Sequence, residues 1–551
     1  MLQPENQNKK YDHLFTDIDT GRIKVPMFQR DFVWTNQQTA RLIDSIIKGF
    51  PIGSFIFWQT KDGLRHIKNI GNVNLPDVPN GESALYVLDG QQRITSLYAV
   101  KKGARVNREG EEIDYRRIFI DLSYEPDAED PVVIADTEPE GPHISVFDLL
   151  NATAAKLAQS FPDTELLNRV DTYQKRLTTY DFSTIVIRNY PIEIACEVFT
   201  RINTGGTTLT LFEIMVAKTY DEPSKFDLLR EYERLLDSKG EEKDLEDVGY
   251  DTISDTTMLQ CIAANLNKQV RAKDILKLER RAVIESWPVV KQAIFTAVDY
   301  LRTELRVPVS RLLPYDALLV PFSYFFIRKQ GWEASAFENA LLKQYFWWAS
   351  LSNRFSSSAE TKIAQDILRM DEILAERVPS YTGEELRLTL DDLRWHGFRS
   401  NEAFCKAILC LYAHFQPRRF NTDALVTLDN RWLRLATSKN YHHFFPKAYL
   451  GKHEVDEEHA NSVLNITLVD DYLNKREIGA NPPSSYMAQF KRRNPNLCET
   501  AKTHLIDDLD EFGVWTDDYI KFIDSRGGRV LTELQMRLNP VEITTGAKTT
   551  E

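Results

Sequence analysis

YHHFFP at residues 441–446 opens the most informative part of this chain. It is followed by NITLV at 465–469 and by DYLNKR at 471–476. Two adjacent histidines are followed by an asparagine, Asn465, at the head of a short strand-like run. A second asparagine, Asn474, comes nine residues later and opens a helical run.

The residue types in this part of the chain suit phosphodiester hydrolysis. Hydrolysis needs a water molecule that is deprotonated near neutral pH, and the ordinary pKa of histidine, about 6.5, lets an imidazole exchange a proton there. Hydrolysis also needs positive charge where the leaving oxygen becomes anionic, which a divalent metal supplies. A pair of histidines alone is more often a surface or core feature. The spacing of Asn465 and Asn474, and the Lys-Arg pair that follows, favour the catalytic interpretation.

This arrangement resembles the HNH nuclease site of the ββα-metal fold. NPPSSY at 481–486 is also similar to the C-terminal nuclease domain of the GmrSD-type (type IV) restriction endonucleases. The resemblance implies that His443 is the general base, that His442 and Asn474 are metal ligands, and that Asn465 pins the loop carrying the histidines. Many family members have Asp where this chain has His442. An imidazole ligand extends the expected ion from Mg²⁺ to Mn²⁺, Ni²⁺ or Zn²⁺.

Length and composition set the limits for the rest of the chain. A chain of 551 residues is too long for one core, so two to four domains are expected. No apolar run approaches the roughly 20 residues that span a membrane, and the first residues lack the basic and apolar regions of a signal peptide. We therefore expect a cytoplasmic protein with no membrane partner. The five cysteines form no CxxC pair, which argues against a disulfide framework or a zinc ribbon.

The net charge of −13 argues against a protein that coats nucleic acid through bulk electrostatics. A local basic groove is compatible with this total. The cluster KRR at 491–493 is the best phosphate contact near the histidines, and a solvated helix face explains it equally well.

A second candidate site lies near the N-terminus. ALYVL at 84–88 has strand length, Asp89 and Gly90 form a turn, and residues 91–100 have helical spacing. A strand that turns through glycine into a helix gathers free backbone N–H groups at the positive end of the helix dipole, which favours an anion. Arg93 could add a bidentate contact to phosphate, and Asp89 could orient a water or hold a metal. The alternative is that Asp89 caps the helix and Arg93 forms an ion pair.

DGQQR at 89–93, with FQR at 28–30 and GFPIGS at 49–54, resembles the N-terminal domain of the same GmrSD family. That domain is similar to the ParB/sulfiredoxin nucleotide-binding fold. The resemblance implies binding of a nucleoside triphosphate and, in some members, its hydrolysis. The residues that would bind the nucleotide are Asp89, Gly90, Gln91, Gln92 and Arg93, with Gln29 and Arg30 across from them.

Local signals predict several helices and their ends. Asn36 and Gly49 are expected to bound a helix over 37–48, and Thr210 with Glu213 forms a predicted capping box. Residues 501–536 are predicted to be mostly helical with an interruption at the adjacent Gly527 and Gly528.

These observations predict a multidomain α+β protein. The expected domains are a ParB-like nucleotide-binding domain at 1–214, a helical domain at 215–420 and a mostly helical HNH domain at 421–551. The predicted function is nucleotide-regulated cleavage of double-stranded DNA, including modified foreign DNA, in bacterial anti-phage defence. A homodimer would bring two sites together for double-strand cleavage. Two alternatives stay open: a nucleotide-dependent sensor or scaffold with an inactive nuclease, and an HNH nuclease that acts on RNA.

Overall fold

The computed structural model describes most of the chain. The described residues are 3–26, 32–61, 64, 66–67, 69–70, 73–76, 78, 82–108, 111–125, 130–202, 210–221, 223–329, 333–381, 386–430, 441–469 and 478–539. The chain divides into two compact units, Met1–Leu228 and Leu229–Glu551. The predicted boundary after residue 214 lies near this division, and the predicted boundary after residue 420 lies inside the second unit; the three-domain division stays a prediction.

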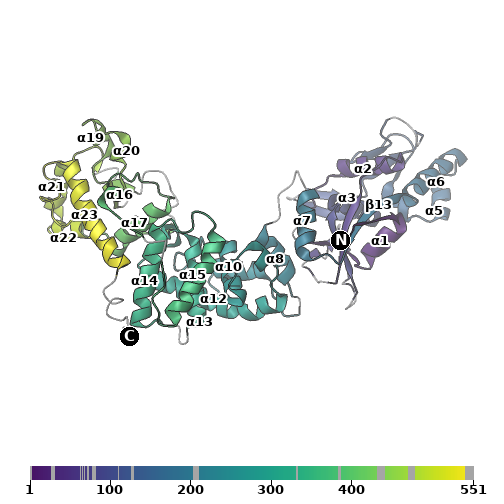
Figure 1. Cartoon of the computed structure of the whole chain (residues 1–551). Coiled ribbons are helices and arrows are strands. Elements are labelled where there is room, and N and C mark those ends of the chain that lie inside the picture. The colour runs from purple at the N-terminus through teal and green to yellow at the C-terminus, as the bar shows by residue number, and fades with distance from the viewer. Residues whose placement is uncertain are drawn as a thin grey trace. The chain divides into compact units, whose positions relative to one another are not determined.

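A mixed sheet forms the centre of the first unit (Figure 1). Its strands lie in the order β1-β13-β3-β7-β2-β4, with β13 parallel to β3 and β7 antiparallel to β3. The strands are β1 (Glu5–Lys10), β13 (Asp181–Arg188), β3 (Phe55–Thr60), β7 (Ala84–Asp89), β2 (Ile23–Pro26) and β4 (His66–Ile67).

Helices pack their apolar sides on this sheet and share one core with it. They are α1 (Tyr11–Asp19), α2 (Asn36–Ile47), α3 (Gln91–Lys102), α4 (Val146–Asn151), α5 (Ala154–Ser160) and α6 (Thr164–Thr178). Two further helices, α7 (Ile192–Ile202) and α8 (Leu211–Thr219), follow β13 along the chain. A second sheet has the order β11-β10-β12, formed by Val133–Ala135, Ile118–Asp121 and His143–Ser145. Two short hairpins pair β5 (Asn69–Ile70) with β6 (Val73–Asn74), and β8 (Arg105–Arg108) with β9 (Glu111–Asp114).

The ends of these helices test the capping predictions. Thr210 and Glu213 form the predicted capping box at the start of α8. The cap of α2 was predicted wrongly, because Thr35 and Gln38 form its capping box. Asn36 is instead buried, and its amide donates to the carbonyl of Asp114 at 3.1 Å.

The second unit is mainly helical (Figure 1). Its first part comprises α9 (Leu228–Leu236), α10 (Asp255–Asn267), α11 (Ala272–Ile275), α12 (Arg280–Thr303), η1 (Ser310–Leu312), η2 (Asp316–Leu318), α13 (Leu319–Arg328), α14 (Ala336–Leu351) and α15 (Ala359–Leu374). Buried apolar side chains run through these helices, among them Phe346 and Trp347 of α14. None of the helices among the described residues is both long enough and apolar enough to cross a membrane.

The later part of this unit surrounds a two-stranded ribbon. Its elements are α16 (Leu390–Arg394), α17 (Ala403–His414), β14 (Tyr441–His443), α19 (Lys447–Gly451), α20 (Glu457–Ala460), η4 (Val463–Asn465), β15 (Ile466–Leu468), α21 (Pro483–Arg493), α22 (Leu497–Lys502) and α23 (Tyr519–Leu538). Together they confirm a mixed α+β fold with a mostly helical C-terminal region.

The predicted interruption at Gly527 and Gly528 is wrong, because α23 continues through both residues. A Cβ atom on Gly527 would lie 2.5 Å from Leu390 Cδ1 and 2.9 Å from Leu464 Cδ1. Glycine is therefore needed at this position for close packing between helix α23 and its neighbours, and not to end the helix.

Candidate active site

The two histidines lie on a short antiparallel ribbon. Strand β14 pairs with β15 so that His442 is opposite Thr467 and His443 is opposite Ile466. Successive side chains on a strand point to opposite faces, so the two imidazoles have different surroundings. His442 is 2% exposed, whereas His443 is only partly buried.

The hydrogen bonds of His442 determine which of its ring nitrogens carries the proton. The Thr467 hydroxyl lies 3.1 Å from Nδ1 and donates its single hydrogen to the His442 carbonyl at 3.3 Å. The Thr467 oxygen must therefore accept a hydrogen from Nδ1, which assigns the lone pair to Nε2. Nε2 is buried and has no hydrogen-bond partner among the described residues. Burial, with smaller contributions from His443 and His504, lowers the pKa of His442 to about 3, so the ring is neutral at pH 7.

A similar argument applies to His443. Asn461 donates through Nδ2 to the carbonyl of Phe398 at 3.0 Å, so its Oδ1 faces His443 Nε2, at 3.0 Å, as an acceptor. His443 Nε2 therefore carries the proton and Nδ1 carries the lone pair. Burial lowers the pKa of His443 to about 4; the bond to Asn461 opposes this change and Lys447 adds to it. The ring is thus an unprotonated base at neutral pH.

Asn465 joins the segments on either side of the ribbon. Its Oδ1 accepts from the Phe445 N–H at 2.8 Å, while Nδ2 donates to the carbonyls of Phe445 at 2.9 Å and Ala460 at 3.0 Å. The side chain is fully buried. Two of these bonds hold the backbone of Phe445, which follows His443 by two residues, and the third joins it to Ala460.

Helix α23 holds the other side of the ribbon through a buried arginine. The Arg526 guanidinium donates to the carbonyls of Leu464 at 2.6 Å and Ile466 at 2.7 Å, and to that of His504 at 3.0 Å. Leu464 and Ile466 flank Asn465 in the sequence, so the Arg526 side chain satisfies the backbone carbonyls on both sides of Asn465. Arg526 also lies over the Tyr412 ring, 4.5 Å from the centroid.

A cavity of about 540 Å³ opens in front of the two histidines. Arg399 is exposed at this cavity. Lys447 also lines it, with its side chain 37% exposed and 3.5 Å from Glu457. An exposed arginine in the lining suits a phosphate ligand. The lining is formed by Phe398, Arg399, Ser400, Asn401, Tyr441, His442, His443, Pro446, Lys447, Ala448, Asn461 and Gly479.

The structure brings three of the four predicted HNH residues together, namely His442, His443 and Asn465. The fourth, Asn474, and the helix expected to carry it lie outside the described residues. Sequence reasoning did not identify Asn461, which orients His443. No local sequence pattern identifies Asn461, because the orientation of its amide depends on the bond to Phe398, which is distant in the sequence.

The turn before α3 has the predicted strand–turn–helix form. Gly90 adopts φ +91° and precedes the first turn of the helix. The Arg93 guanidinium donates to the Ile52 carbonyl at 2.6 Å, the Ser54 carbonyl at 3.1 Å and Asp89 Oδ2 at 2.9 Å. These bonds match the alternative in which Arg93 forms an ion pair, although the helix cap is Gly90 and not Asp89.

The neighbours of Arg93 explain why glycine and glutamine surround it. A Cβ atom on Gly53 would lie 2.8 Å from Arg93 Nη1, so the 52–54 segment can reach the guanidinium only with glycine at this position. Gln92 is buried and accepts from the Val33 N–H at 2.9 Å. Gln91 is buried as well, while Gln29 and Arg30 lie outside the described residues. The nucleotide role of these residues stays a prediction.

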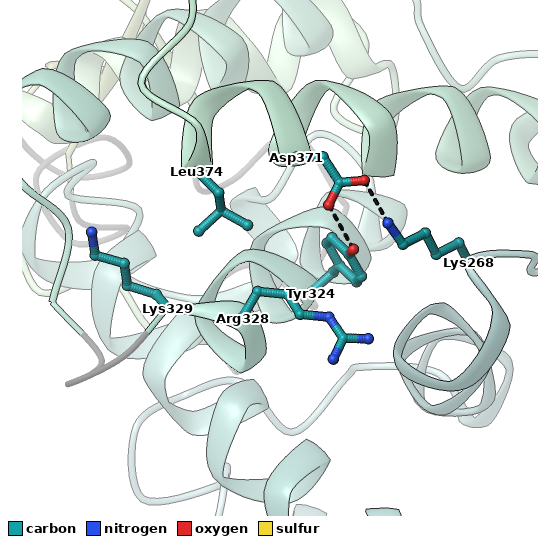
Figure 2. Close-up of a pocket in the computed structure, with 6 residues that line it drawn as sticks. All are labelled: Lys268, Tyr324, Arg328, Lys329, Asp371 and Leu374. Atoms are coloured by element: carbon teal, nitrogen blue, oxygen red, sulfur yellow. Dashed lines mark hydrogen bonds and ion pairs between the residues drawn. The ribbon is translucent and has the colours of Figure 1, made fainter.

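A second positively charged cavity, of about 590 Å³, lies between α10, α13 and α15. Asp371 accepts from Lys268 and from the Tyr324 hydroxyl, both at 2.7 Å (Figure 2). Arg328 donates to the Asn265 carbonyl at 2.6 Å, and Lys329 pairs with the buried Glu338 at 2.7 Å. The cations of this cavity are therefore engaged in bonds that hold the helices, and we assign it no ligand.

Comparison with known proteins adds to this geometry. The chain is 23% identical over 542 residues to an uncharacterized protein of Methanocaldococcus jannaschii, and the match covers 89% of this chain and 88% of that protein. Residues 11–220 match the family model of the GmrSD restriction endonuclease N-terminal domain. Residues 11–220 are therefore similar to the N-terminal domain of the GmrSD restriction endonucleases.

Proposed function

We propose that this protein is an endonuclease that cleaves DNA phosphodiesters in the cavity formed by His442 and His443. The observation that carries the proposal is the pair of neutral imidazoles in one cavity, each with an assigned lone pair. The match of residues 11–220 to a restriction endonuclease family supports the same conclusion.

His443 would act as the general base. Its Nδ1 lone pair takes the proton of the attacking water, while Asn461 holds the Nε2–H and stabilises the imidazolium that results. Asn461 is thus a positioning residue, comparable to the carboxylate or carbonyl that orients other catalytic histidines. Asn465 and Arg526 keep the loop and the ribbon fixed during the reaction.

His442 fits the role of a metal ligand. Its Nε2 lone pair is buried and unpartnered among the described residues, and the opposite nitrogen is anchored by Thr467, as ligating histidines commonly are. His442 and Asn474 would hold the ion, which when bound would polarise a phosphoryl oxygen and stabilise the leaving oxygen. Mg²⁺ and Mn²⁺ are the first ions to test, and an imidazole ligand also suits Ni²⁺ and Zn²⁺.

The test is cleavage of double-stranded DNA, plain and modified, with Mg²⁺ or Mn²⁺. We expect His443→Ala to reduce the rate by about 10²- to 10⁴-fold, the contribution of a general base. His453→Ala is the matched control, because His453 is exposed and its ring bonds, among the described residues, to the nearby Tyr449 carbonyl; it should keep the wild-type rate. Equal rates for wild type and His443→Ala would refute the assignment.

The same assay separates the two alternatives. A sensor with an inactive nuclease would cut no DNA with any of these ions, and an RNA-directed nuclease would cut RNA in preference to DNA. The HNH residues act on a phosphodiester and not on a sugar, so both polymers are assayed in parallel.

We also propose that a nucleotide bound at the turn before α3 regulates cleavage, because an unregulated nuclease would cut its host's DNA. The supporting features are Gly90 in the left-handed conformation and the backbone N–H groups of the first turn of α3. Arg93 would act indirectly by holding the 52–54 segment beside the turn. Cleavage that is identical with and without each nucleoside triphosphate would exclude this regulation and leave the nuclease proposal intact.

A further inference from the structure

Three side chains with different metal-binding atoms meet at the two ends of a loop, residues 398–401, that lines the cavity of His442 and His443. They are His396, Glu402 and Cys405, and their ligand atoms all lie within 4.8 Å of one another. His396 Nε2 is 3.1 Å from Glu402 Oε1, and Cys405 Sγ is 3.9 Å from Glu402 Oε2. Glu402 and Cys405 are three residues apart at the start of α17, which places them on one face of the helix.

The surroundings of the cluster suit a bound cation. Cys405 is fully buried, whereas the side chains of His396 and Glu402 are 28% and 31% exposed, so an ion could enter from their side. The backbone N–H of Arg399 donates to Cys405 Sγ at 3.4 Å, a contact that stabilises a thiolate.

The donor set indicates the class of ion. One imidazole nitrogen, one carboxylate oxygen and one thiolate sulfur are typical ligands of Zn²⁺ and chemically similar ions, and they are unsuited to Mg²⁺ or Ca²⁺. Three protein ligands leave a fourth, tetrahedral position for water on the exposed side.

The loop between these ligands forms part of the cavity. Residues 398–401 all line it, together with His442 and His443. The backbone of the loop is also tied to the segment that orients the histidines, because the Phe398 N–H donates to the Asn461 carbonyl and the Val463 N–H donates to the His396 carbonyl, both at 2.8 Å. Any restraint on His396 therefore reaches Asn461, the partner of His443.

We propose that His396, Glu402 and Cys405 bind a Zn²⁺-class ion that clamps the 396–402 loop against the nuclease cavity. The ion is distinct from the catalytic one in its ligands, because sulfur is absent from the predicted set of His442 and Asn474. Binding of the ion does not depend on the proposed function; only its effect on cleavage rests on that function.

Co²⁺ is the probe, because a Co²⁺–thiolate bond gives a near-ultraviolet charge-transfer absorption that nitrogen and oxygen ligands do not give. The full-length protein is stripped with a chelator and titrated with Co²⁺. We expect this absorption in wild type and in His442→Ala, and its loss in Cys405→Ser. The matched control is Cys498→Ser, which changes the exposed cysteine and should keep the absorption. Absence of the absorption in wild type, or its survival in Cys405→Ser, would overturn the proposal.

A second variant covers the case in which Cys405→Ser fails to fold. Glu402→Gln keeps the thiolate and the size of the partly exposed side chain, and we expect it to weaken Co²⁺ binding by roughly tenfold or more. Unchanged affinity in Glu402→Gln would count against the carboxylate as a ligand and overturn the three-ligand site.

Cleavage assays on the same proteins separate the two proposals. The clamp predicts that Zn²⁺-loaded wild type cuts faster than stripped protein when Mg²⁺ is supplied to both, and that Cys405→Ser loses this difference. Absorption without any cleavage would support the ion site and refute the proposed nuclease activity. Cleavage without absorption would support the nuclease activity and refute the ion site.

Discussion

Arg93, which is partly buried, and His442, which is buried, are polar residues of the two candidate sites. They differ in how many of their hydrogen-bonding atoms have a partner in the protein. The Arg93 guanidinium makes three bonds to the protein itself, to Ile52, Ser54 and Asp89. His442 is anchored at one nitrogen, and its other nitrogen has no partner among the described residues. Because buried polar groups are normally paired, the unpaired one marks the place where a ligand is expected.

Arg93 therefore stabilises a turn, whereas His442 has a nitrogen that could bind a ligand. The motif around Arg93 would then be essential for the shape of a binding site without contacting its ligand. The ribbon of His442 and His443, with its cavity, would be the place where the reaction occurs. Four experiments test this comparison.

The largest expected effect is that acid lowers the stability of the second unit. His442 and His504 have pKa values lowered to about 3, and His414 and His443 to about 4, chiefly by burial. The unfolded chain binds these protons near the ordinary pKa of about 6.5, so between these values the unfolded state holds more protons. The free energy of unfolding should therefore fall as pH decreases from about 6.5 toward 4, by up to roughly 3 kcal/mol for each histidine.

Pulse proteolysis with mass spectrometry at pH 7 and pH 4.5 would locate the region that opens. We expect cleavage sites within 229–551 to appear first. His504→Gln should lower by about one the number of protons that the chain takes up on unfolding at acidic pH. The slope of the unfolding free energy against pH should decrease accordingly. A second unit that is equally stable at both pH values would contradict the burial of neutral histidines.

Arg93→Met should destabilise the first unit by about 3 kcal/mol, since it leaves two carbonyls and Asp89 without their charged donor. Denaturant unfolding is the measurement. Arg201→Met is the matched control, because Arg201 is 78% exposed in its pair with Glu197 and should change stability by less than about 0.5 kcal/mol. Full stability of Arg93→Met combined with lost nucleotide binding would instead make Arg93 a direct ligand.

Asn461→Leu removes the acceptor for His443 Nε2 and the donor to Phe398 while keeping the volume of the side chain similar. We expect cleavage to slow by roughly 10- to 100-fold, as when other orienting partners of histidine are lost. The pH–rate profile should shift as well, because the bond to Asn461 raises the pKa of His443. A lower rate with an unchanged profile would indicate only structural damage.

Gly527→Ala should cost about 1 to 2 kcal/mol, because its Cβ would overlap Leu390 and Leu464 and shift the segment before Asn465. Gly528→Ala is the matched control one residue away: it meets no atom within 4 Å and should stabilise the helix by up to about 1 kcal/mol. Thermal unfolding of both variants measures the difference. Equal effects would show that the close contact at Gly527 is tolerated.

Several local features of the fold followed from the sequence, because they depend on neighbouring residues. The capping box at Thr210 and Glu213, the strand–turn–helix at Gly90 and helix α2 are examples. Gly527 was misread because its function is contact with Leu390, more than a hundred residues earlier, which no local pattern reveals.

The candidate site divides in the same way. The adjacent histidines and the asparagine that follows them could be singled out from residue types alone, because few side chains can hold a cation or exchange a proton near neutral pH. The lone pairs of the two rings, the contacts of Asn461 and Arg526, and the bonds of Arg93 could be assigned only from the folded chain. Protonation and hydrogen bonding depend on distance and burial, and both are set here by segments that lie far apart in the sequence.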